Sequence, residues 1–223
     1  MLLQPHYVRE YRRLVHNLMR TSTADDVARQ AVGGDFEEMG QLQYAVLRKI
    51  GLRDDDYVID VGCGSGRTAC ALRDIGTLRY LGIDVVPELI AYARQTIARP
   101  DWTFAVVEGL TIPERDAQAD LVVMFSVLTH LTRREGWKYL SDAVRVLKPG
   151  GRIIASFLDT ELQHHKGAAG HWFTQMRERL LGRSVRNQLL RKDDMRSWAN
   201  KLNVRIELSG PEGIGQSYAV ITK

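Results

Sequence analysis

A glycine-rich turn directly after a short apolar run constrains this chain more than any other feature. Residues 58–67 read Val-Ile-Asp-Val-Gly-Cys-Gly-Ser-Gly-Arg, so Gly62, Gly64 and Gly66 stand at alternate positions. Glycines at this spacing allow a tight turn and let a ligand approach the backbone without meeting a Cβ atom. The apolar run predicts a buried strand, and the residues after the turn predict a helix whose first N–H groups are free. The segment therefore predicts a ligand-binding strand–turn–helix unit.

The residues around this turn indicate which ligand it binds. A dinucleotide-binding loop has glycine or alanine at the sixth position of its Gly-x-Gly-x-x-Gly pattern, and this chain has Arg67 there. Asp60 lies two residues before the first glycine, where a carboxylate suits an amino group better than a pyrophosphate. Asp84 ends the next predicted strand, 18 residues beyond Gly66, and a carboxylate there can accept both hydroxyls of a ribose. The pattern therefore argues against a dinucleotide.

Helical and strand patterns alternate along the 223 residues, with no internal repeat and no low-complexity linker. This alternation predicts a single α/β domain with a mainly parallel sheet and helices on both faces. The expected parallel strands are residues 57–61, 80–83, 103–107, 121–125 and 152–157. Two final strands, 204–208 and 217–222, are separated by a turn rich in glycine and proline, and predict an antiparallel hairpin.

Two segments depart from this alternation. Residues 1–50 predict an N-terminal helical cover, with helices over 5–19 and 36–50. Residues 159–190 hold three glycines and scattered aromatic and histidine side chains, and this stretch is too long for a plain connection. We therefore predict a helical insertion or lid near the site.

The composition argues against a membrane protein. No apolar run approaches the roughly 18 to 20 residues that a membrane span needs, and the basic N-terminus lacks the apolar core of a signal peptide. Cys63 and Cys70 are the only cysteines, too few for a disulfide framework, so the sequence predicts a cytoplasmic protein. The net charge is +4. Basic residues gather in 177–196, which predicts a solvated helical face, with binding of an anionic substrate or a nucleic-acid backbone as the alternative.

Five stretches, in order, resemble the class I S-adenosylmethionine-dependent methyltransferases that act on small molecules. Residues 58–67 resemble the family's first motif, and Tyr-Leu-Gly-Ile-Asp at 80–84 resembles the second. The other three are Val-Glu-Gly-Leu-Thr-Ile-Pro at 107–113, Asp-Leu-Val-Val-Met-Phe-Ser-Val-Leu-Thr-His-Leu at 120–131 and Val-Leu-Lys-Pro-Gly-Gly at 146–151. The resemblance covers about residues 36–158 and the final hairpin. It implies a Rossmann-like, seven-stranded, mostly parallel sheet in the order 3-2-1-4-5-7-6.

The resemblance also implies the cofactor, S-adenosyl-L-methionine, and its product, S-adenosyl-L-homocysteine. By this resemblance, Asp84 holds the ribose, and Asp60 acts on the amino end, directly or through water. The methionyl part lies against the glycine turn, formed by Gly62, Gly64 and Gly66.

The resemblance implies roles for three further residues of the cofactor site. Ser126, in the loop after the fourth strand, flanks the sulfonium. Glu108 or Gly109 lies at the adenine, although Glu108 stands where the family has aspartate. Residues 36–41 resemble the family's N-terminal cover of the pocket.

His130 is the predicted general base for the methyl acceptor. It follows the fourth strand, at the sheet edge where ligands bind in such folds, and an imidazole titrates in the range that proton transfer needs. Asp159 lies just past the fifth strand at the same edge, where it would orient His130 or bind a substrate hydroxyl. A structural role in a turn or cap is the alternative for each residue. We therefore predict O-methylation of a small hydroxylated metabolite, such as a sugar or a natural product.

Other readings stay open. The predicted insertion holds three histidines, His164, His165 and His171, but no metal motif of defined spacing, so no metal is predicted. An N-methyltransferase of a small amine and an RNA-directed methyltransferase are the alternative enzymes, and a non-catalytic cofactor-binding module is the alternative from another class. The fourth strand lacks the Asn/Asp-Pro-Pro-Tyr/Phe sequence expected for methylation of base amino groups. The predicted partner is therefore a small-molecule acceptor rather than nucleic acid, and the extra N-terminal helix offers a surface for a homodimer.

Overall fold

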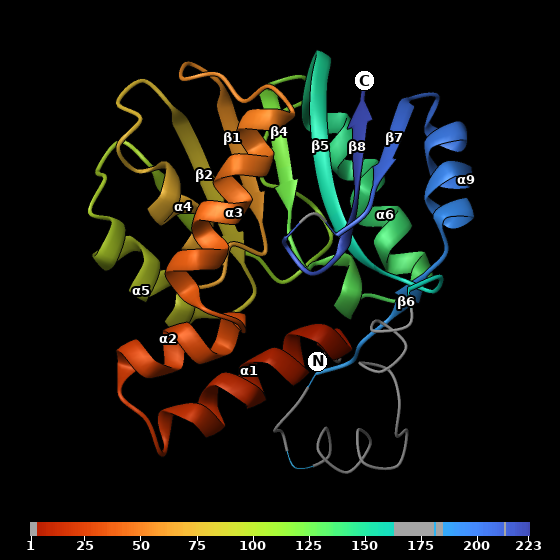
Figure 1. The fold of residues 1–223 in the computed structure, drawn as a ribbon. Coiled ribbons are helices and arrows are strands. Elements are labelled where there is room, and N and C mark those ends of the chain that lie inside the picture. The colour runs from red at the N-terminus through yellow and green to blue at the C-terminus, as the bar shows by residue number, and fades with distance from the viewer. Residues whose placement is uncertain (1–3, 163–180, 182–184, 212) are drawn as a thin grey trace.

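The computed structural model describes residues 4–162, 181, 185–211 and 213–223. A central, mainly parallel sheet has helices on both faces, as predicted from the sequence (Figure 1). Its strands are β1 (Tyr57–Val61), β2 (Arg79–Asp84), β3 (Thr103–Val106), β4 (Ala119–Met124), β5 (Leu147–Asp159), β6 (Leu189–Leu190), β7 (Arg205–Ser209) and β8 (Ser217–Thr222). The described helices are α1 (His6–Met19), α2 (Ala24–Val32), α3 (Phe36–Lys49), α4 (Arg67–Leu72), α5 (Pro87–Ile97), the short 3₁₀ helix η1 (Leu128–His130), α6 (Arg133–Val146) and α9 (Lys192–Leu202).

The strands lie in the order β3-β2-β1-β4-β5-β8-β7, with β8 antiparallel to both of its neighbours. Counted without β6, this is the seven-strand order that the sequence resemblance implies. The short strand β6 is an addition, and it pairs in parallel with the end of β5. The sequence interpretation placed its residues in the insertion, because a strand of two residues has no periodic signal.

Some of the predictions fall outside the described residues. Most of the predicted insertion at 159–190 lies there, including His164, His165 and His171. In the part of the chain that the structure describes, no helix is long and apolar enough to cross a membrane.

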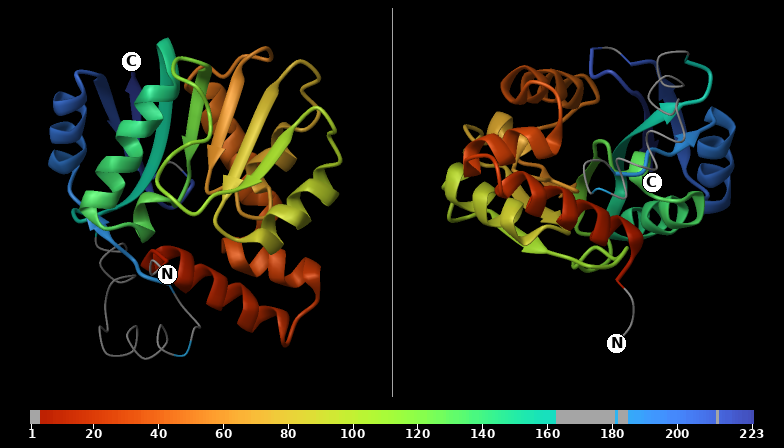
Figure 2. Two further views of the ribbon diagram at one scale, coloured as in Figure 1. Left: turned by 180° about the vertical axis from the view of Figure 1, so that it is seen from behind. Right: turned by 90° about the horizontal axis from the view of Figure 1, so that it is seen from below.

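The N-terminal cover has three helices in place of the two predicted. The missed helix, α2, begins after Thr23, whose hydroxyl accepts a hydrogen bond from the N–H of Asp26 at 3.2 Å and donates one to its carboxylate at 2.7 Å. Ser or Thr followed three residues later by an acid is a helix-start pattern, so this signal is present in the sequence. Both α1 and α2 lie across the carboxyl ends of the parallel strands (Figures 1 and 2).

Alternation along β1 divides the core between the two faces of the sheet. Val58 packs with side chains of α3, α4 and α5, whereas Ile59 and Val61 pack with those of α6 and α9. Asp60 therefore shares the α3–α4 side with Val58, near the carboxyl end of the strand. This register places a carboxyl group inside the fold, directly before the glycine turn.

Candidate functional site

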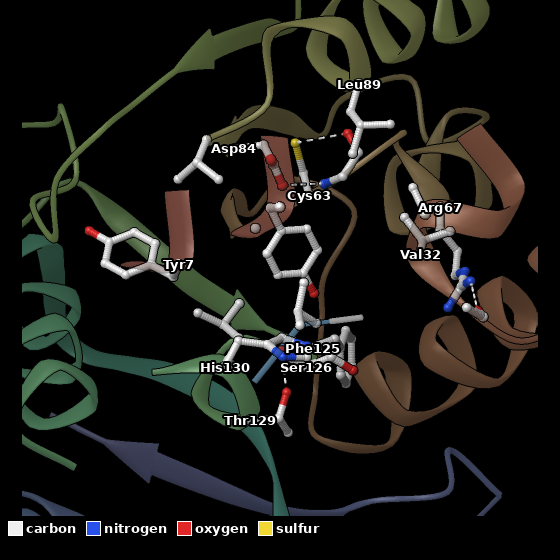
Figure 3. A pocket seen from close by; sticks show the side chains of 18 of the residues that line it. Tyr7, Val32, Cys63, Arg67, Asp84, Leu89, Phe125, Ser126, Thr129 and His130 are labelled. Carbon is white, nitrogen blue, oxygen red and sulfur yellow. Dashed lines mark hydrogen bonds between the residues drawn. The ribbon is translucent and has the colours of Figure 1, made fainter. Parts of the chain in front are cut away.

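A cavity of about 440 Å³ lies at the carboxyl ends of the parallel strands, and side chains of α1 and α2 contribute to its lining. Figure 3 shows this cavity from close by. Its volume lies within the roughly 300 to 1,000 Å³ that is typical of small-molecule sites. Of the predicted site residues, six line it: Asp60, Gly62, Gly64, Asp84, Ser126 and His130. Gly66, Glu108, Gly109 and Asp159 are not among its lining residues. The structure therefore brings the predicted strand-end residues together and leaves four candidates outside.

The glycine turn depends on its glycines for both conformation and space. Gly62 has φ +70° and Gly64 has φ +54°, in the left-handed region that disfavours side chains. A Cβ atom at Gly62 would lie 2.7 Å from a methyl of Val127, and one at Gly64 would lie 2.6 Å from a methyl of Val32. The close neighbours are thus walls of the cavity itself. Gly66 instead caps α4 and faces α5.

Asp84 joins β2 to the glycine turn. One carboxylate oxygen accepts the N–H of Gly64 at 2.9 Å, and the other accepts the N–H of Val86 at 2.9 Å. Burial raises the pKa of Asp84, and these backbone hydrogen bonds oppose the rise. Because a carboxylate oxygen has two lone pairs, each oxygen can still accept a hydrogen bond from a ligand hydroxyl.

Asp60 is 2% exposed and has hydroxyl groups as its partners. Tyr80 donates to its carboxylate at 2.5 Å. Burial raises the pKa of Asp60 to about 7, which outweighs the opposing hydrogen bond from Tyr80, and the nearby Asp84 raises it further. No cation among the described residues lies beside this buried acid, which suits it to receive a cationic group of a ligand.

His130 lies on the opposite wall from the glycine turn, beside Ser126 (Figure 3). Its Nδ1 lies 2.6 Å from the carbonyl oxygen of Arg186. Since a carbonyl only accepts, Nδ1 carries the proton and donates it, and Nε2 is left as an acceptor. Burial lowers the pKa of His130, so the imidazole is neutral at pH 7. The Tyr11 ring packs edge-on against it, with centroids 5.1 Å apart.

Asp159 is fully buried and lies away from the cavity lining. Its carboxylate accepts from the N–H of Glu161 at 2.9 Å and from the hydroxyl of Ser217 at 3.3 Å, and Lys192 lies 3.4 Å from it. The predicted role of orienting His130 is filled instead by the Arg186 carbonyl. The strand-end position of Asp159 suggested the site, but the side chain faces the β6–α9 side of the strand end.

Glu108 anchors the N-terminal cover rather than lining the cavity. It forms an ion pair with Arg12 at 2.8 Å and accepts a hydrogen bond from Gln4. Its side chain is 56% exposed. Val107 is the residue of this segment that reaches the cavity. Glu108 and Gly109, the residues expected at the adenine, therefore do not line the cavity, and the preceding residue does.

Comparisons with known proteins agree with this geometry. Residues 59–155 match the family profile described as methyltransferase domain. A demethylmenaquinone methyltransferase of Tropheryma whipplei (strain Twist) is 32% identical over 111 residues, 49% of this chain and 45% of that protein. A 27-O-demethylrifamycin SV methyltransferase of Amycolatopsis mediterranei (strain S699) is 30% identical over 112 residues, 48% of this chain and 40% of that protein. The chain thus matches less than half the length of these curated relatives.

A solved structure extends the likeness over nearly the whole chain. A SAM-dependent methyltransferase from Thermotoga maritima superposes with a TM-score of 0.64 at 15% identity, covering 98% of this chain and 99% of that one. Residues 59–155 thus belong to the methyltransferase domain family, and the fold is that of class I S-adenosylmethionine-dependent methyltransferases. The glycine turn, Asp60 and Asp84 of that domain are the residues from which the sequence predicted it.

The methyl donor of this domain family is S-adenosyl-L-methionine, and the cavity residues fit it. Asp84 keeps lone pairs for two ribose hydroxyls, and Asp60 offers an acid without a cationic partner to the amino group. The polar side chains near Asp60 include Thr68, whose hydroxyl donates to Gln43 at 3.1 Å. In the described part of the methyltransferase domain, no group of three or more His, Cys, Asp or Glu side chains could hold a metal ion.

Several lining residues of the methyltransferase domain were not predicted. Tyr7 and Tyr11 come from α1, and Gln216 comes from the turn before β8. The two tyrosines share one helix face by their spacing, but spacing does not tell what that face covers. Arg67 is 8% exposed, and its guanidinium donates to the carbonyl of Gly33. Its Nε has no hydrogen-bond partner in the part of the chain that the structure describes. Among the described lining residues, it is the one Lys or Arg.

Proposed function

We propose that this protein transfers a methyl group from S-adenosyl-L-methionine to an oxygen of a small hydroxylated molecule. The observation that carries the proposal is His130. It is neutral, it holds its proton on Nδ1, and it lines the same cavity as the glycine turn and Asp84. The unprotonated Nε2 can therefore take the proton that a hydroxyl loses during methyl transfer.

In this proposal, one end of the cavity binds the cofactor and the other end binds and deprotonates the methyl acceptor. When bound, the cofactor supplies an electrophilic methyl carbon on a sulfonium. Asp84 and Asp60 fix the ribose and the amino end, which orients that carbon toward the far wall. His130 accepts the hydroxyl proton there, and the α1 side chains Tyr7 and Tyr11 exclude water. Positioning of this kind supplies much of the rate enhancement of a displacement reaction.

The Amycolatopsis mediterranei relative supports oxygen as the methylated atom, since its name specifies a 27-O-demethyl acceptor. The apolar and aromatic walls around His130 support a compact, weakly polar acceptor. The acceptor is therefore proposed to be a hydroxylated natural-product-like molecule.

Two measurements test the proposal. Isothermal titration with S-adenosyl-L-homocysteine is expected to give binding, and absence of binding would refute the enzyme proposal. Transfer from tritiated S-adenosyl-L-methionine is then screened over phenols, alcohols and amines. For an accepted phenol or alcohol, His130→Ala should lower turnover by about 10² or more. The exposed His16→Ala serves as the matched control.

The base role of His130 is wrong if His130→Ala retains turnover within about threefold of the unmodified protein. Titration of the variant with S-adenosyl-L-homocysteine shows whether its cavity is still folded. Preferred transfer to amines, with no transfer to hydroxyl groups, would contradict O-methylation while leaving the cofactor assignment intact.

A further inference from the structure

Ser126, directly after β4, has a backbone conformation that is rare for a side-chain-bearing residue, with φ +59°. A closed ring of three hydrogen bonds holds it. The Ser126 N–H donates to Ser156 Oγ at 2.7 Å, Ser156 Oγ donates to Gln216 Oε1 at 2.8 Å, and Gln216 Nε2 donates to Ser126 Oγ at 2.9 Å. The Thr129 hydroxyl also donates to the Ser126 carbonyl at 2.6 Å. Non-glycine residues in this conformation cluster at functional sites.

The hydrogen-bond ring favours one orientation of the Gln216 amide, and this orientation defines the donor and the acceptor of each hydrogen bond. With the Gln216 amide reversed, the buried Ser156 oxygen would receive two donors, and its own hydrogen would have no acceptor among the described residues. In the observed direction, two hydrogens of the ring have no acceptor among the described residues: the second N–H of the Gln216 amide and the hydroxyl hydrogen of Ser126. The Ser126 oxygen accepts from Gln216, so its hydroxyl hydrogen is available to a ligand. Both Ser126 and Gln216 line the cavity.

This donor lies at the same end of the cavity as an acceptor (Figure 3). His130 Nε2 accepts, because Nδ1 holds the proton for the Arg186 carbonyl. Arg67, the one Lys or Arg among the described lining residues, donates to Gly33 at the α2 side of the cavity. The His130 end thus offers the Ser126 hydroxyl as a donor and His130 Nε2 as an acceptor, and no ammonium or guanidinium among the described lining residues.

We propose that Gln216 and Ser156 are positioning residues that hold the Ser126 hydroxyl as a donor to the methyl acceptor. The acceptor is then a neutral molecule whose reactive hydroxyl faces His130, and whose neighbouring oxygen accepts from Ser126. This inference rests on the proposed O-methylation and names the substrate class for the same site.

Two isomeric phenols test the donor directly. Ortho-methoxyphenol places an accepting oxygen beside the hydroxyl, and meta-methoxyphenol moves it away with little change in size or polarity. With tritiated S-adenosyl-L-methionine, kcat/KM for the ortho isomer should exceed that for the meta isomer by about threefold to tenfold, as expected for one neutral hydrogen bond. Ser126→Ala should bring this ratio close to one.

The Gln216→Glu variant distinguishes a positioning role from a purely structural one, because only a positioning role predicts that the ortho preference depends on pH. Ionised glutamate has no donor, so the Ser126 hydroxyl should turn to it, and the ortho preference should vanish at pH 8. As the pH falls through the pKa of the glutamate, its protonated form donates again and the preference should return. The exposed Gln118→Glu carries the same charge change far from the cavity and should keep the preference of the unmodified protein.

Each outcome decides the matter. Equal kcat/KM for both isomers in the unmodified protein would overturn the inference, as would an unchanged preference in both Ser126→Ala and Gln216→Glu at pH 8. Failure to methylate either phenol, in a protein that binds S-adenosyl-L-homocysteine and methylates other hydroxyl compounds, would overturn the substrate class alone. If the unmodified protein does not bind S-adenosyl-L-homocysteine, it is the proposed function that fails. Affinity for S-adenosyl-L-homocysteine also shows whether each variant is folded.

Discussion

The buried carboxyl group of Asp60 should cost the folded protein stability at neutral and alkaline pH. Burial raises its pKa from 3.8 to about 7. A group with a raised pKa contributes stability that is full below the unfolded-state value and is lost as the pH rises through the folded-state value. The Asp60→Asn variant keeps an oxygen for the Tyr80 hydroxyl but cannot ionise, so it should escape this loss.

The magnitude follows from the two pKa values. At pH 5 the folded-state penalty is about 2 kcal/mol, and at pH 8 it is about 4 kcal/mol, because unfolded Asp60 is ionised at both pH values and folded Asp60 only at the higher. The unmodified protein should therefore lose about 2 to 3 kcal/mol of unfolding free energy between these two pH values relative to Asp60→Asn. The same variant should bind S-adenosyl-L-homocysteine roughly 10- to 100-fold more weakly, because it removes the charge that we propose holds the amino group by a charge-assisted hydrogen bond.

Urea unfolding at pH 5 and pH 8, followed by circular dichroism, measures the first effect, and isothermal titration measures the second. Asp120→Asn is the matched control. Burial disfavours the charge of Asp120, but hydrogen bonds from Lys148 and from the Tyr57 backbone outweigh burial and lower its pKa. Its stabilisation is lost only below the pH range tested, so this control should keep the pH dependence of the unmodified protein. The same pH dependence in Asp60→Asn would refute the reasoning.

Three further predictions concern catalysis, the turn and a helix start. The acid limb of kcat/KM should lie below pH 6.5, because burial lowers the pKa of His130 and the neutral form is the base; a limb above pH 6.5 would contradict this. Gly64→Ala should weaken S-adenosyl-L-homocysteine binding by about tenfold or more in titration, because its backbone is left-handed and Val32 fills the space. Gly210→Ala, which meets nothing within 4 Å, should bind as the unmodified protein does. Thr132→Ala should lower the Tm by about 2 to 4 °C through loss of the capping box of α6, with unchanged cofactor affinity; an unchanged Tm would argue against the cap.

The alternating sheet was predictable because each of its signals is local. The mainly apolar run from Tyr57 to Val61 predicts a buried strand from five consecutive residues, and β1 has the same bounds in the structure. Pro87 and Gly51 mark helix ends through backbone chemistry alone. Asp60 and Asp84 could be placed at the cavity from the sequence, because a residue at the carboxyl end of a parallel strand is positioned by the strand itself.

The placements that spacing does not predict involve side chains whose direction depends on distant partners. Asp159 also ends a strand, but Ser217 and Lys192 draw its carboxylate away from the cavity, and both lie far along the chain. Glu108 matches a family position, yet Arg12 of the N-terminal helix pairs with it. Gln216 carries no local signal, since its importance arises from a hydrogen-bond ring that joins the residues after β4, within β5 and before β8. Tertiary contacts of this kind cannot be read from spacing.

Because α2 packs directly on the glycine turn, we expect the docking of this helix to contribute to the free energy of cofactor binding. Val32 fills the space over Gly64, and the Ser65 hydroxyl donates to the Ala28 carbonyl at 2.7 Å. Docking of α2 and the binding-competent shape of the turn are therefore one thermodynamic equilibrium, and linkage requires that each favour the other equally. A ligand held by the turn should slow amide hydrogen exchange throughout α2, including amides that never touch it. By the same reciprocity, any substitution that loosens α2 is felt as a weaker cofactor affinity.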